Sequence, residues 1–572
     1  MHEIVEYTIS EWRGLNMRSL KVDEAFLILK SMFTRRTYLY SLSEACYSCP
    51  YTKVKALHPY HYNDNITLDV AYPIKFKLID DDVGQYAFDN VTSLCEYQNL
   101  SCGEFGVYNL TLDEYGSCEW RTDKEAVNIY YPMLAVFILL ALAIVVFKIG
   151  LCAWRSFRYE VITGTVNSTD CGVDITTTNR RNRMRSLDTF RGLAIVLMIF
   201  VNSGGGHYWW IEHAPWNGLH LADIVFPSFL WIMGVCIPIS IKSQIRRDDT
   251  KYHICLKIIW RSLKLFLIGL CLNSINGPKL ENLRIMGVLQ RFGIAYLICG
   301  LAHTMFSQRI IIEPQIAWKR KFQDLLIMRG ELLMMIFLIA VYLCTIFGLN
   351  LPDCPRGYLG PGGKHSNAEY FNCIGGASGY IDLLVLGNNH IYQYPTAKYI
   401  YDSKPFDPEG VFGCLLTIVQ VFFGVLAGVI ILTHTTWRAR INRWLIWSII
   451  LALIGGALSD FSSENGSIPI NKNLWSLSFV CVTSALAFAS LSLLYYIIDV
   501  KYWWQGYPFE AAGMNAIILY VGHTVMHKML PWHWRIGPMN THFVLLLESV
   551  WNTLLWLCIA SYLNYKKFYF SL

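Results

Sequence analysis

The segment RSLDTFRGLAI at residues 185–195, followed by VNSGGGHYWW at 201–210, EHAPWNG at 212–218 and ADIVFP at 222–227, decides how this chain is organised. It contains a charged helix start, an apolar run, a loop rich in glycine and tryptophan, and a second apolar run. The loop is too polar to lie in lipid, because hydrocarbon leaves backbone hydrogen-bonding groups unpaired. The sequence therefore predicts two membrane spans joined by a loop at one membrane face, with His213 near the centre of the loop.

The composition of the whole chain also indicates a membrane protein. Of its 572 residues, 54% are hydrophobic and 16% are charged, whereas soluble chains carry about 25% charged residues. The formal net charge of +6 would suggest nucleic acid as a partner of a soluble protein. Here the Lys and Arg residues lie between apolar runs, so they are explained by orientation in a membrane, and no nucleic-acid partner is predicted.

Apolar runs near the length of a bilayer crossing predict a polytopic α-helical membrane protein with about eleven transmembrane helices. The first run extends from Met133 to Cys152, within a predicted transmembrane segment at 131–153. Residues 154–187 form a basic linker, and residues 188–572 hold the other ten spans as one transmembrane domain. These ten runs lie near 188–203, 221–241, 254–274, 286–306, 331–349, 411–433, 444–458, 474–498, 514–530 and 544–563.

Basic residues in alternate loops set the predicted orientation. The positive-inside rule places these loops, together with the C-terminus, in the cytosol. The N-terminal domain and the loops at 204–220 and 350–410 then face the lumen, and so does His213. The basic loops are 154–187, 242–251, 309–329 and 438–443.

Residues 1–130 are predicted to form a small β-rich lumenal domain. Apolar and polar residues alternate in Ile74-Lys-Phe-Lys-Leu, and Asn109-Leu-Thr-Leu is also strand-like. Residues 1–20 contain no apolar run of the signal-peptide type. Two explanations stay open: the first apolar run inserts with its N-terminal side in the lumen, or the native chain starts elsewhere.

Cysteines and glycosylation sequons occur in the same segments, which indicates an oxidising lumen. Cys46-x-x-Cys49 is interpreted as a disulfide rather than a redox or metal motif, and Cys354 and Cys373 share one long polar loop. The pairing of the cysteines cannot be deduced from their spacing. The predicted glycosylation sites are Asn65, Asn90, Asn99, Asn109 and Asn465.

His213 is the first candidate for chemistry. A histidine changes charge near neutral pH and serves as a general base or a nucleophile, although it can also be a structural residue in an aromatic loop. Asn202 and Asp223 flank the loop on the adjacent spans. Asn202 would donate its amide N–H to a developing oxyanion. Asp223 would orient His213 or cap its own helix, and Glu212 offers a second carboxylate beside His213.

The three histidines of the loop do not predict a metal site. His207, His213 and His220 have no matching thiolates or carboxylates, and their spacing fits no zinc pattern. No metal is therefore expected.

A stripe of cations is the second candidate site. Lys257, Arg261 and Lys264 share one helix face because they are spaced four and three residues apart. Cations inside a span usually face a cavity or a partner, and a ligand with several phosphates would suit this stripe. Snorkelling toward lipid headgroups is the alternative, and it suits Lys257 best. Arg191 would pair with Asp188 or join the phosphate site.

Other polar and aromatic residues near the spans are candidates as well. A polar side chain within a span is costly, so it serves either function or helix association. The tryptophans of the loop would stack against the apolar face of a sugar or form an aromatic belt at the membrane surface. The candidates are Gln290, Arg291, Asn515, His523 and Glu548 in the spans, and Trp209, Trp210, Trp216 and Asn217 in the loop.

Motifs after about residue 130 follow the order found in one membrane-protein family. They are DTFRG at 188–192, NSGGG at 202–206, HAPWNG at 213–218, ADIVFP at 222–227, GVLQR at 287–291, GYLGPGG at 357–363, DPEG at 407–410, PINKNLWS at 469–476 and GMN at 513–515. In these motifs the chain resembles the heparan-alpha-glucosaminide N-acetyltransferase family of the lysosomal membrane. Gln290, Arg291 and Asn515 lie within them, so they rank above Glu548.

The resemblance implies transfer of acetyl from cytosolic acetyl-CoA to the amine of the terminal non-reducing α-glucosamine of heparan sulfate in the lysosome. It implies His213 as the catalytic histidine and a homodimer in the membrane. Direct transfer to the amine and transfer through an acetyl-histidine both stay open, with direct transfer preferred because it exposes no labile intermediate. The expected acetyl-CoA-binding residues are Arg191, Lys257, Arg261, Lys264, Gln290, Arg291, Asn515 and His523, and the expected sugar-binding residues are Trp209, Trp216 and Asn217.

Two other functions remain as alternatives at this stage. A polytopic transporter also carries charges within its spans. A related membrane acyltransferase would act on a different sugar acceptor. Release of CoA separates an enzyme from a transporter, and a comparison of glucosamine with glucose as acceptors separates the two enzymes.

Overall fold

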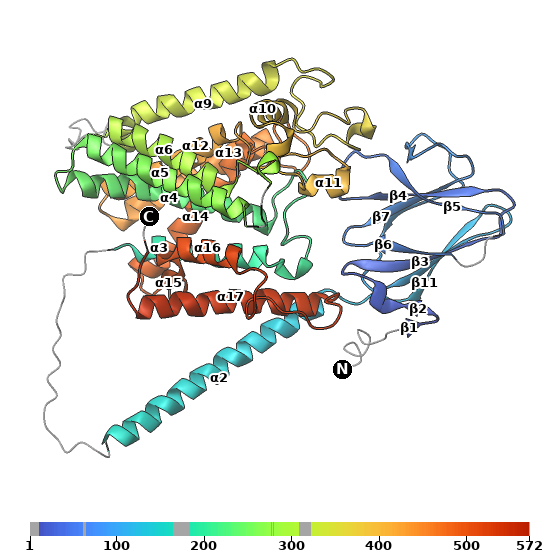
Figure 1. The fold of residues 1–572 in the computed structure, drawn as a ribbon, viewed down its shortest axis with the longest axis horizontal. Coiled ribbons are helices and arrows are strands. Elements are labelled where there is room, and N and C mark those ends of the chain that lie inside the picture. Colours follow the sequence, from blue (N-terminus) through green and yellow to red (C-terminus); the bar gives the residue numbers. More distant parts are fainter. Residues whose placement is uncertain are drawn as a thin grey trace.

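A β-rich N-terminal domain and a helical domain lie side by side in the computed structural model of the chain (Figure 1). The structure describes residues 11–60, 64–163, 183–275, 277, 279–307 and 322–570. Predictions for the chain start, for most of the linker at 154–187, for part of the basic loop at 309–329 and for the last two residues fall outside this described part.

Two β-sheets pack face to face in the N-terminal domain. One has the strand order β11-β10-β3-β6 and the other β8-β5-β4-β7-β9, and a short hairpin of β1 and β2 precedes them. The strands are β1 (Glu11–Trp12), β2 (Leu15–Asn16), β3 (Glu24–Ser31), β4 (Thr37–Ser43), β5 (Tyr51–Leu57), β6 (Asp64–Asp69), β7 (Ile74–Ile79), β8 (Tyr86–Ala87), β9 (Cys95–Leu100), β10 (Val107–Leu112) and β11 (Cys118–Lys124).

Alternating side chains of both sheets form the core of this domain. Leu27 of β3 and Leu110 of β10 pack with Leu39 of β4 and with Phe76 and Leu78 of β7. In a two-layer sheet only every second residue of a strand faces the core, which explains the alternation in the sequence. The predicted strands around residues 74–78 and 109–112 are confirmed.

The described residues form three disulfides, two in the N-terminal domain and one in the long loop of the helical domain. Cys95–Cys118 joins β9 to β11 and therefore links the two sheets. Cys46–Cys49 closes a tight turn and Cys354–Cys373 closes part of the long polar loop. The expectation of a disulfide at 46–49 is confirmed.

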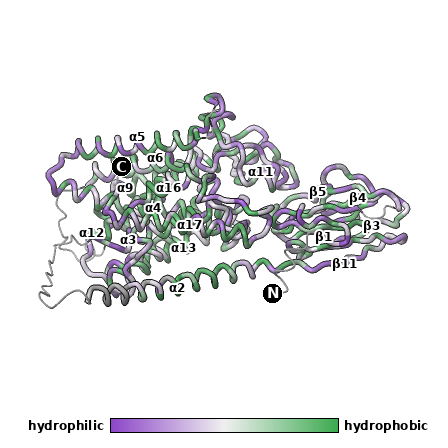
Figure 2. Tube along the Cα trace, turned by 60° about the horizontal axis from the view of Figure 1, so that its bottom comes forward, coloured by the Kyte–Doolittle hydropathy of each residue, from purple (hydrophilic) through white to green (hydrophobic). Residues whose placement is uncertain are grey.

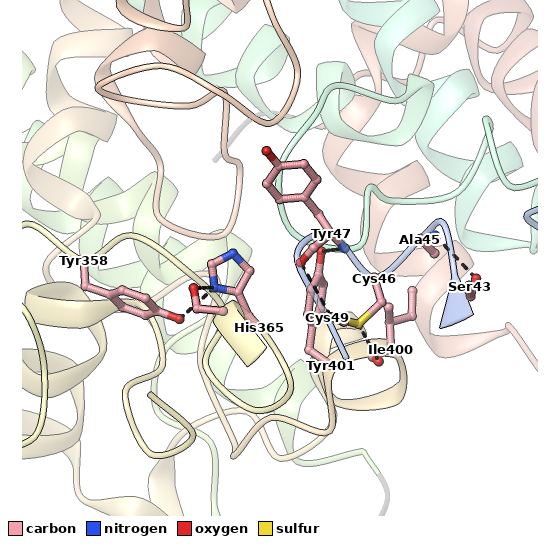
Figure 3. The surroundings of a disulfide bond; sticks show 10 residues. Ser43, Ala45, Cys46, Tyr47, Cys49, Tyr358, His365, Ile400 and Tyr401 are labelled. Carbon is pink, nitrogen blue, oxygen red and sulfur yellow. Dashed lines mark hydrogen bonds between the residues drawn. A yellow bond between two sulfur atoms is a disulfide. The ribbon is translucent and has the colours of Figure 1, made fainter. Parts of the chain in front are cut away.

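The turn at Cys46–Cys49 is also a contact point between the two domains (Figure 3). The backbone N–H of Tyr47 donates to the hydroxyl of Tyr401, and the Tyr47 hydroxyl donates to Oδ1 of Asn465, at 2.7 Å. Tyr401 ends α11 (Thr396–Tyr401), which belongs to the long loop. The N-terminal domain therefore packs on the same end of the helical domain as the loop 350–410 and Asn465.

The helical domain is built around two adjacent helices, α4 (Leu221–Ile245) and α12 (Cys414–Thr433), which are buried along most of their length. Gly234 and Gly424 let their backbones touch, since a Cβ at either glycine would clash with the other helix. The surrounding helices are α3 (Arg185–Asn202), α5 (Lys251–Asn273), α6 (Val288–Phe306), α8 (Gln323–Ile327), α9 (Arg329–Gly348), α10 (Gly376–Leu386), α13 (Trp437–Leu458), α14 (Leu477–Tyr495), α15 (Phe509–Met514), α16 (Ala516–Val525) and α17 (His542–Tyr565).

Helix α2 (Tyr130–Thr163) stands at an angle beside this bundle and meets it near α17 (Figure 1). It is largely hydrophobic (Figure 2), and Leu134, Phe137 and Val146 are exposed. A helix with this composition and so little burial is suited to a lipid environment.

Helices occur at all eleven predicted apolar runs, and the predicted fold class is confirmed. Among the described residues, seven helices are long and apolar enough to cross a membrane. The run at 514–530 contains only the short helix α16, because Asn515 separates it from α15. The chain is a multi-pass membrane protein, and the number of eleven crossings stays a prediction.

Candidate active site

The loop after α3 brings His213 against the start of α4. Nδ1 of His213 lies 2.7 Å from Oδ1 of Asp223, which is buried with an exposed side-chain fraction of 1%. Oδ2 of Asp223 accepts the backbone N–H groups of Ala214 and His220 at 3.1 Å. Asp223 is therefore placed both to cap α4 and to fix the histidine, the two alternatives considered for it.

The contact with Asp223 determines which ring nitrogen of His213 carries a proton. An ionised carboxylate only accepts hydrogen bonds, so Nδ1 of His213 carries a proton, and Nε2 is the nitrogen that bears the lone pair when the ring is neutral. His213 is 41% exposed, so Nε2 is accessible from the loop side. A neutral imidazole held in this way has the arrangement that a general base or nucleophile requires.

Lys472 approaches the same ring from the loop before α14. Its Nζ lies 3.0 Å from Nδ1 and 3.2 Å from Nε2 of His213, and 3.7 Å from Oδ1 of Asp223. Because Nζ is nearly equidistant from the two ring nitrogens, it lies against the ring and not along the in-plane lone pair of Nε2. Lys472 therefore places a positive charge beside the His213 ring and the Asp223 carboxylate.

A buried ion cluster lies next to Lys472. Arg284 binds Asp407 at 2.5 Å and Glu409 at 2.6 Å through Nη2. Burial acts to raise the pKa of Glu409, but the Arg284 guanidinium and the Lys472 ammonium outweigh it and hold that pKa below its usual range. Glu409 is thus ionised and lines the same cavity as His213.

Asn202 lies at the end of α3, with its amide directed toward α16. Its Nδ2 is 3.0 Å from Nε2 of His523, while Nδ1 of His523 is 2.9 Å from the Leu519 carbonyl. A carbonyl only accepts, so Nδ1 of His523 carries the proton and Nε2 accepts one N–H of Asn202. The orientation of the amide is therefore fixed, and Asn202 keeps a second N–H.

These groups surround a small cavity of about 100 Å³, the reaction chamber. Asn202, His213, Glu409 and Lys472 supply its polar wall, and Tyr520 is among its other residues. It therefore brings together two of the three predicted catalytic residues, with Asp223 directly behind His213.

A larger cavity of about 380 Å³, the donor cavity, lies beside it among α3, α4, α5, α6 and the C-terminal residues. Most of its wall is apolar. The two cavities share Met198, Phe226, Val288 and Tyr520. They therefore adjoin, and together they connect the His213 loop with the opposite end of the bundle.

Guanidinium groups line the donor cavity. Arg183 and Arg191 are both held by Asp188, at 2.6 Å and 3.4 Å. Arg191 also approaches the Gly513 carbonyl at 3.4 Å, because Gly192 and Gly513 bring α3 and α15 into backbone contact. The two motifs DTFRG and GMN thus meet at one wall of this cavity.

The donor cavity contains polar atoms without a partner in the described part of the chain. Nε of Arg261 and Oε1 of Gln244 are buried and make no hydrogen bond there. Arg261 lies over the ring of Tyr296 at 4.9 Å. Buried polar atoms normally have partners, so this wall offers a donor, Nε of Arg261, and an acceptor, Oε1 of Gln244, to a polar ligand.

Only one member of the predicted cation stripe reaches this cavity. Arg261 lines it, whereas Lys257 pairs with Asp249 at 2.7 Å and Lys264 is exposed and absent from the lining. The three side chains share one helix face, but a helix in a bundle buries only part of that face.

Three further candidates for cofactor binding lie outside the cavity lining and contact other parts of the chain. Arg291 is buried, donates to the Gly410 carbonyl at 2.8 Å and lies over the ring of Trp475. Gln290 is buried near Gly269. Asn515 bonds the backbone of Phe568 and Phe570, and so holds the C-terminal residues against the donor cavity.

The loop residues expected to bind sugar are also used in packing. Trp216 is buried and donates its indole N–H to the Leu359 carbonyl at 2.8 Å. Asn217 donates to Glu464 at 3.0 Å and accepts from Asn471. Trp209 is exposed and lies against Tyr72 of the N-terminal domain and against His220.

The predicted glycosylation sites differ in accessibility. Asn65, Asn90 and Asn465 are exposed, whereas Asn109 is buried in its sheet and its amide contacts Asp123. The side chain of Asn99 lies outside the described part. No group of three residues suited to a metal ion occurs among the residues described.

Sequence reasoning missed three polar residues of this site: Lys472, Glu409 and Arg284. The first two lie in the motifs PINKNLWS and DPEG, which carried the resemblance. The motifs gave a signal for them, but no periodicity connected either loop to His213. Arg284 precedes the motif GVLQR by a few residues and gave no signal of its own.

Comparison with known proteins gives a consistent result. The family model described as the catalytic region of heparan-alpha-glucosaminide N-acetyltransferase matches residues 183–343. Heparan-alpha-glucosaminide N-acetyltransferase of Mus musculus is 35% identical over 597 residues, covering 96% of this chain and 88% of the mouse protein. That of Homo sapiens is 42% identical over 399 residues, covering 68% of this chain and 60% of the human protein.

Proposed function

The chain belongs to the heparan-alpha-glucosaminide N-acetyltransferase family, and on that premise we propose how this membrane-bound glucosaminide N-acetyltransferase works. Acetyl-CoA enters from the cytosol. The acceptor is the amine of a terminal non-reducing α-glucosamine of heparan sulfate in the lysosomal lumen. The observation that carries this proposal is the pair of adjoining cavities, with arginines at one end and His213 at the other.

The donor cavity is the proposed site of acetyl-CoA. Arg183, Arg191 and Arg261 would bind its phosphates, since guanidinium groups bind phosphate oxygens in a fixed fork geometry. The apolar wall formed by Met198 and Phe226 would take the pantetheine arm. The acetyl thioester is the activated acyl group. Because the two cavities share lining residues, the thioester would lie next to Asn202 and His213.

The lumenal end is the proposed site of the amine. An acidic lumen protonates a free amine, so the acceptor arrives as an ammonium ion. Three carboxylates, Asp223, Asp407 and Glu409, lie there with the cations Arg284, Arg291 and Lys472. Asp223 and Glu409 are the carboxylates next to His213 and would attract the ammonium ion toward it.

His213 is the proposed general base. The incoming ammonium group donates to the lone pair of Nε2, and His213 accepts its proton while Asp223 stabilises the imidazolium. The amine nitrogen then bonds to the acetyl carbon, and the free N–H of Asn202 donates to the oxyanion. The C–S bond breaks, CoA leaves as the thiolate and takes the His213 proton, and the second proton of the nitrogen passes to water as the amide forms.

Direct transfer fits the cavities better than transfer through an acetyl-histidine. The reaction chamber adjoins the donor cavity and is open toward the loop side through the exposed His213 ring. Both substrates can therefore meet in one complex, and no acetyl group has to be stored. Incubation with radiolabelled acetyl-CoA alone should then leave no label on the protein.

The proposed orientation places the N-terminal domain, the loop 350–410 and the His213 loop in the lumen, and the C-terminus in the cytosol. The disulfides and the exposed Asn465 support it, because they gather at the end where Tyr47 contacts Tyr401. The lysosomal membrane and a homodimer are further parts of the proposal and rest on the resemblance. The exposed apolar face of α2 supports contact with lipid.

The test is acetyl transfer by the purified protein in detergent, with radiolabelled acetyl-CoA and glycosides of glucosamine or glucose as acceptors. Wild type should acetylate the glucosaminide and release CoA. His213→Ala should be folded and inactive, whereas His220→Ala in the same loop should remain active. Transfer by folded His213→Ala at the wild-type rate would exclude His213 as the base, and transfer to glucose alone would exclude the amine acceptor.

A further inference from the structure

A third cavity, of about 510 Å³, lies on the other side of Asn202 from the donor cavity. It is formed by the end of α3, the loop 526–541 and the first turns of α17. The loop holds this position through Asn540, which donates to the Leu20 carbonyl of the N-terminal domain at 2.9 Å. The cavity is therefore at the end of the molecule where the proposed acceptor arrives, and the catalytic steps above do not use it.

One cation at this cavity has no carboxylate partner. Arg535 is exposed at its rim and forms no ion pair within the part of the chain that the structure describes. His527 lies beside His533, with ring centroids 6.4 Å apart. Two carboxylates face the group: Glu548 pairs with His533, and Glu212 pairs with His207 at 2.9 Å. Arg535 is thus left without a counter-ion from the described chain.

The interior of the cavity offers hydrogen bonds to a neutral ligand group. Asn552 is only 4% exposed and lines the cavity. Its Nδ2 donates to Oγ of Ser203 at 2.7 Å, while its Oδ1 has no partner among the described residues. Nε1 of Trp532, another lining residue, is unpartnered there as well. A buried acceptor and a buried donor beside a rim cation match a ligand with hydroxyl groups and one negative charge.

Asn202 connects this cavity to the reaction chamber. It is part of the lining of both, and its amide is fixed by His523 at 3.0 Å. A glycan whose terminal amino sugar reaches His213 would pass Asn202 with its second residue. In a heparan chain glucosamine alternates with a hexuronate, so that second residue carries a carboxylate.

We propose that the cavity lined by Arg535, His527 and Asn552 is a binding subsite for the hexuronate linked to the terminal glucosamine. The proposal rests on the proposed function and adds the second sugar to it. Arg535 binds the carboxylate, and Oδ1 of Asn552 accepts a sugar hydroxyl. The enzyme thus recognises a disaccharide end rather than glucosamine alone.

The experiment compares three acceptors with the full-length protein in detergent: methyl α-glucosaminide, glucosaminyl-α-1,4-glucuronate and glucosaminyl-α-1,4-glucose. The two disaccharides differ only in the carboxylate. In wild type, kcat/KM for the glucuronate disaccharide should exceed that for the glucose disaccharide by about tenfold or more, the usual effect of a charge-assisted hydrogen bond. Arg535→Gln should reduce this ratio to about one, because Arg535 is the rim cation without a counter-ion.

Lys528→Gln is the matched control. Lys528 is an exposed cation of the same loop but does not line the cavity, so its removal should preserve the ratio. Equal kcat/KM for both disaccharides in wild type would overturn the proposal, as would an equal loss of ratio in the two variants. Lack of transfer to any of the three acceptors would instead overturn the proposed function, so the two failures are distinguishable.

Discussion

The donor cavity and the reaction chamber differ in how far their charged side chains are paired within the protein. The donor cavity is about 380 Å³, mostly apolar, and presents three arginines to one carboxylate, Asp188. The reaction chamber is about 100 Å³, and its charged groups already contact one another. The first is suited to binding a polyanion supplied from outside, and the second is suited to orienting a histidine before any substrate arrives.

This difference follows from what each end must do. A phosphate ligand brings its own negative charge, so the cations that bind it need few carboxylate partners within the protein. A base must hold one tautomer, which requires a fixed carboxylate such as Asp223 behind it. We therefore expect changes in the reaction chamber to lower kcat, and changes in the donor cavity to raise the KM for acetyl-CoA.

Removal of the base should give the largest effect. We expect His213→Ala to lower kcat by about 1000-fold, within the usual range of general acid–base catalysis, with the KM for acetyl-CoA unchanged. Steady-state kinetics with a fixed glucosaminide measure both parameters. A rise in the KM for acetyl-CoA at unchanged kcat would remove the distinction between the two cavities.

Removal of the Lys472 charge should give a smaller loss in the same parameter. We expect Lys472→Gln to lower kcat by about 10- to 100-fold, because the positive charge that lies against the His213 ring and helps to keep Glu409 ionised is lost. The matched control is Lys404→Gln, which changes an exposed lysine of the neighbouring loop. If both variants keep the wild-type kcat, Lys472 has no part in the reaction.

A change in the donor cavity should affect cofactor binding instead. We expect Arg261→Met to raise the KM for acetyl-CoA by about tenfold, the effect of one lost charge-assisted contact, and to change kcat little. Lys257→Met, on the same face of the same helix, should behave like wild type since Lys257 contacts Asp249. Equal effects of the two variants would favour the whole cation stripe as the phosphate site.

The two ends should also differ in their response to pH, because arginines do not titrate in the physiological range. At the His213 end Glu104 is buried, and burial raises its pKa from 4.5 to about 7, although the nearby His542 opposes the shift. His542 in turn bonds the Gly206 carbonyl at 2.8 Å. Glu104 therefore supports the glycine loop that leads to His213.

The sign of this effect is fixed by the raised pKa. Protonated Glu104 makes its full contribution to the free energy of unfolding below pH 4.5. This contribution is lost as the pH rises through about 7, where Glu104 ionises in the folded protein. We expect a loss on the order of 2–3 kcal/mol across this window, and a smaller one in Glu104→Gln. Thermal unfolding in detergent between pH 4.5 and 7.5 measures it. Equal pH dependence of the two proteins would mean that Glu104 does not titrate in this window.

Much of the fold was predictable from periodicity and composition. The β-rich start, the helices at the apolar runs and the disulfide at Cys46–Cys49 all depend on local patterns, and each is present. The contact between Asp223 and His213 was one of two stated alternatives, because both residues belong to a single loop and its following helix.

The rest of the site could not be predicted because it is assembled from distant parts of the chain. Lys472 and Glu409 reach His213 from loops about 260 and 200 residues away in the sequence, respectively, and hydrophobic periodicity contains no information on such pairing. The cation stripe is the opposite case, in which a local pattern was interpreted correctly but did not identify the residues of the cavity. Its spacing correctly predicted one helix face, but only Arg261 of that face borders the donor cavity.

The central claim is that the two substrates reach one chamber from opposite sides of the membrane. The most direct test uses sealed proteoliposomes with acetyl-CoA and a charged, impermeant glucosaminide placed on the same side or on opposite sides. Transfer should occur only when they are on opposite sides, whichever way each molecule is inserted, while the same preparation in detergent transfers acetyl freely. Transfer with both substrates outside sealed vesicles would contradict the account.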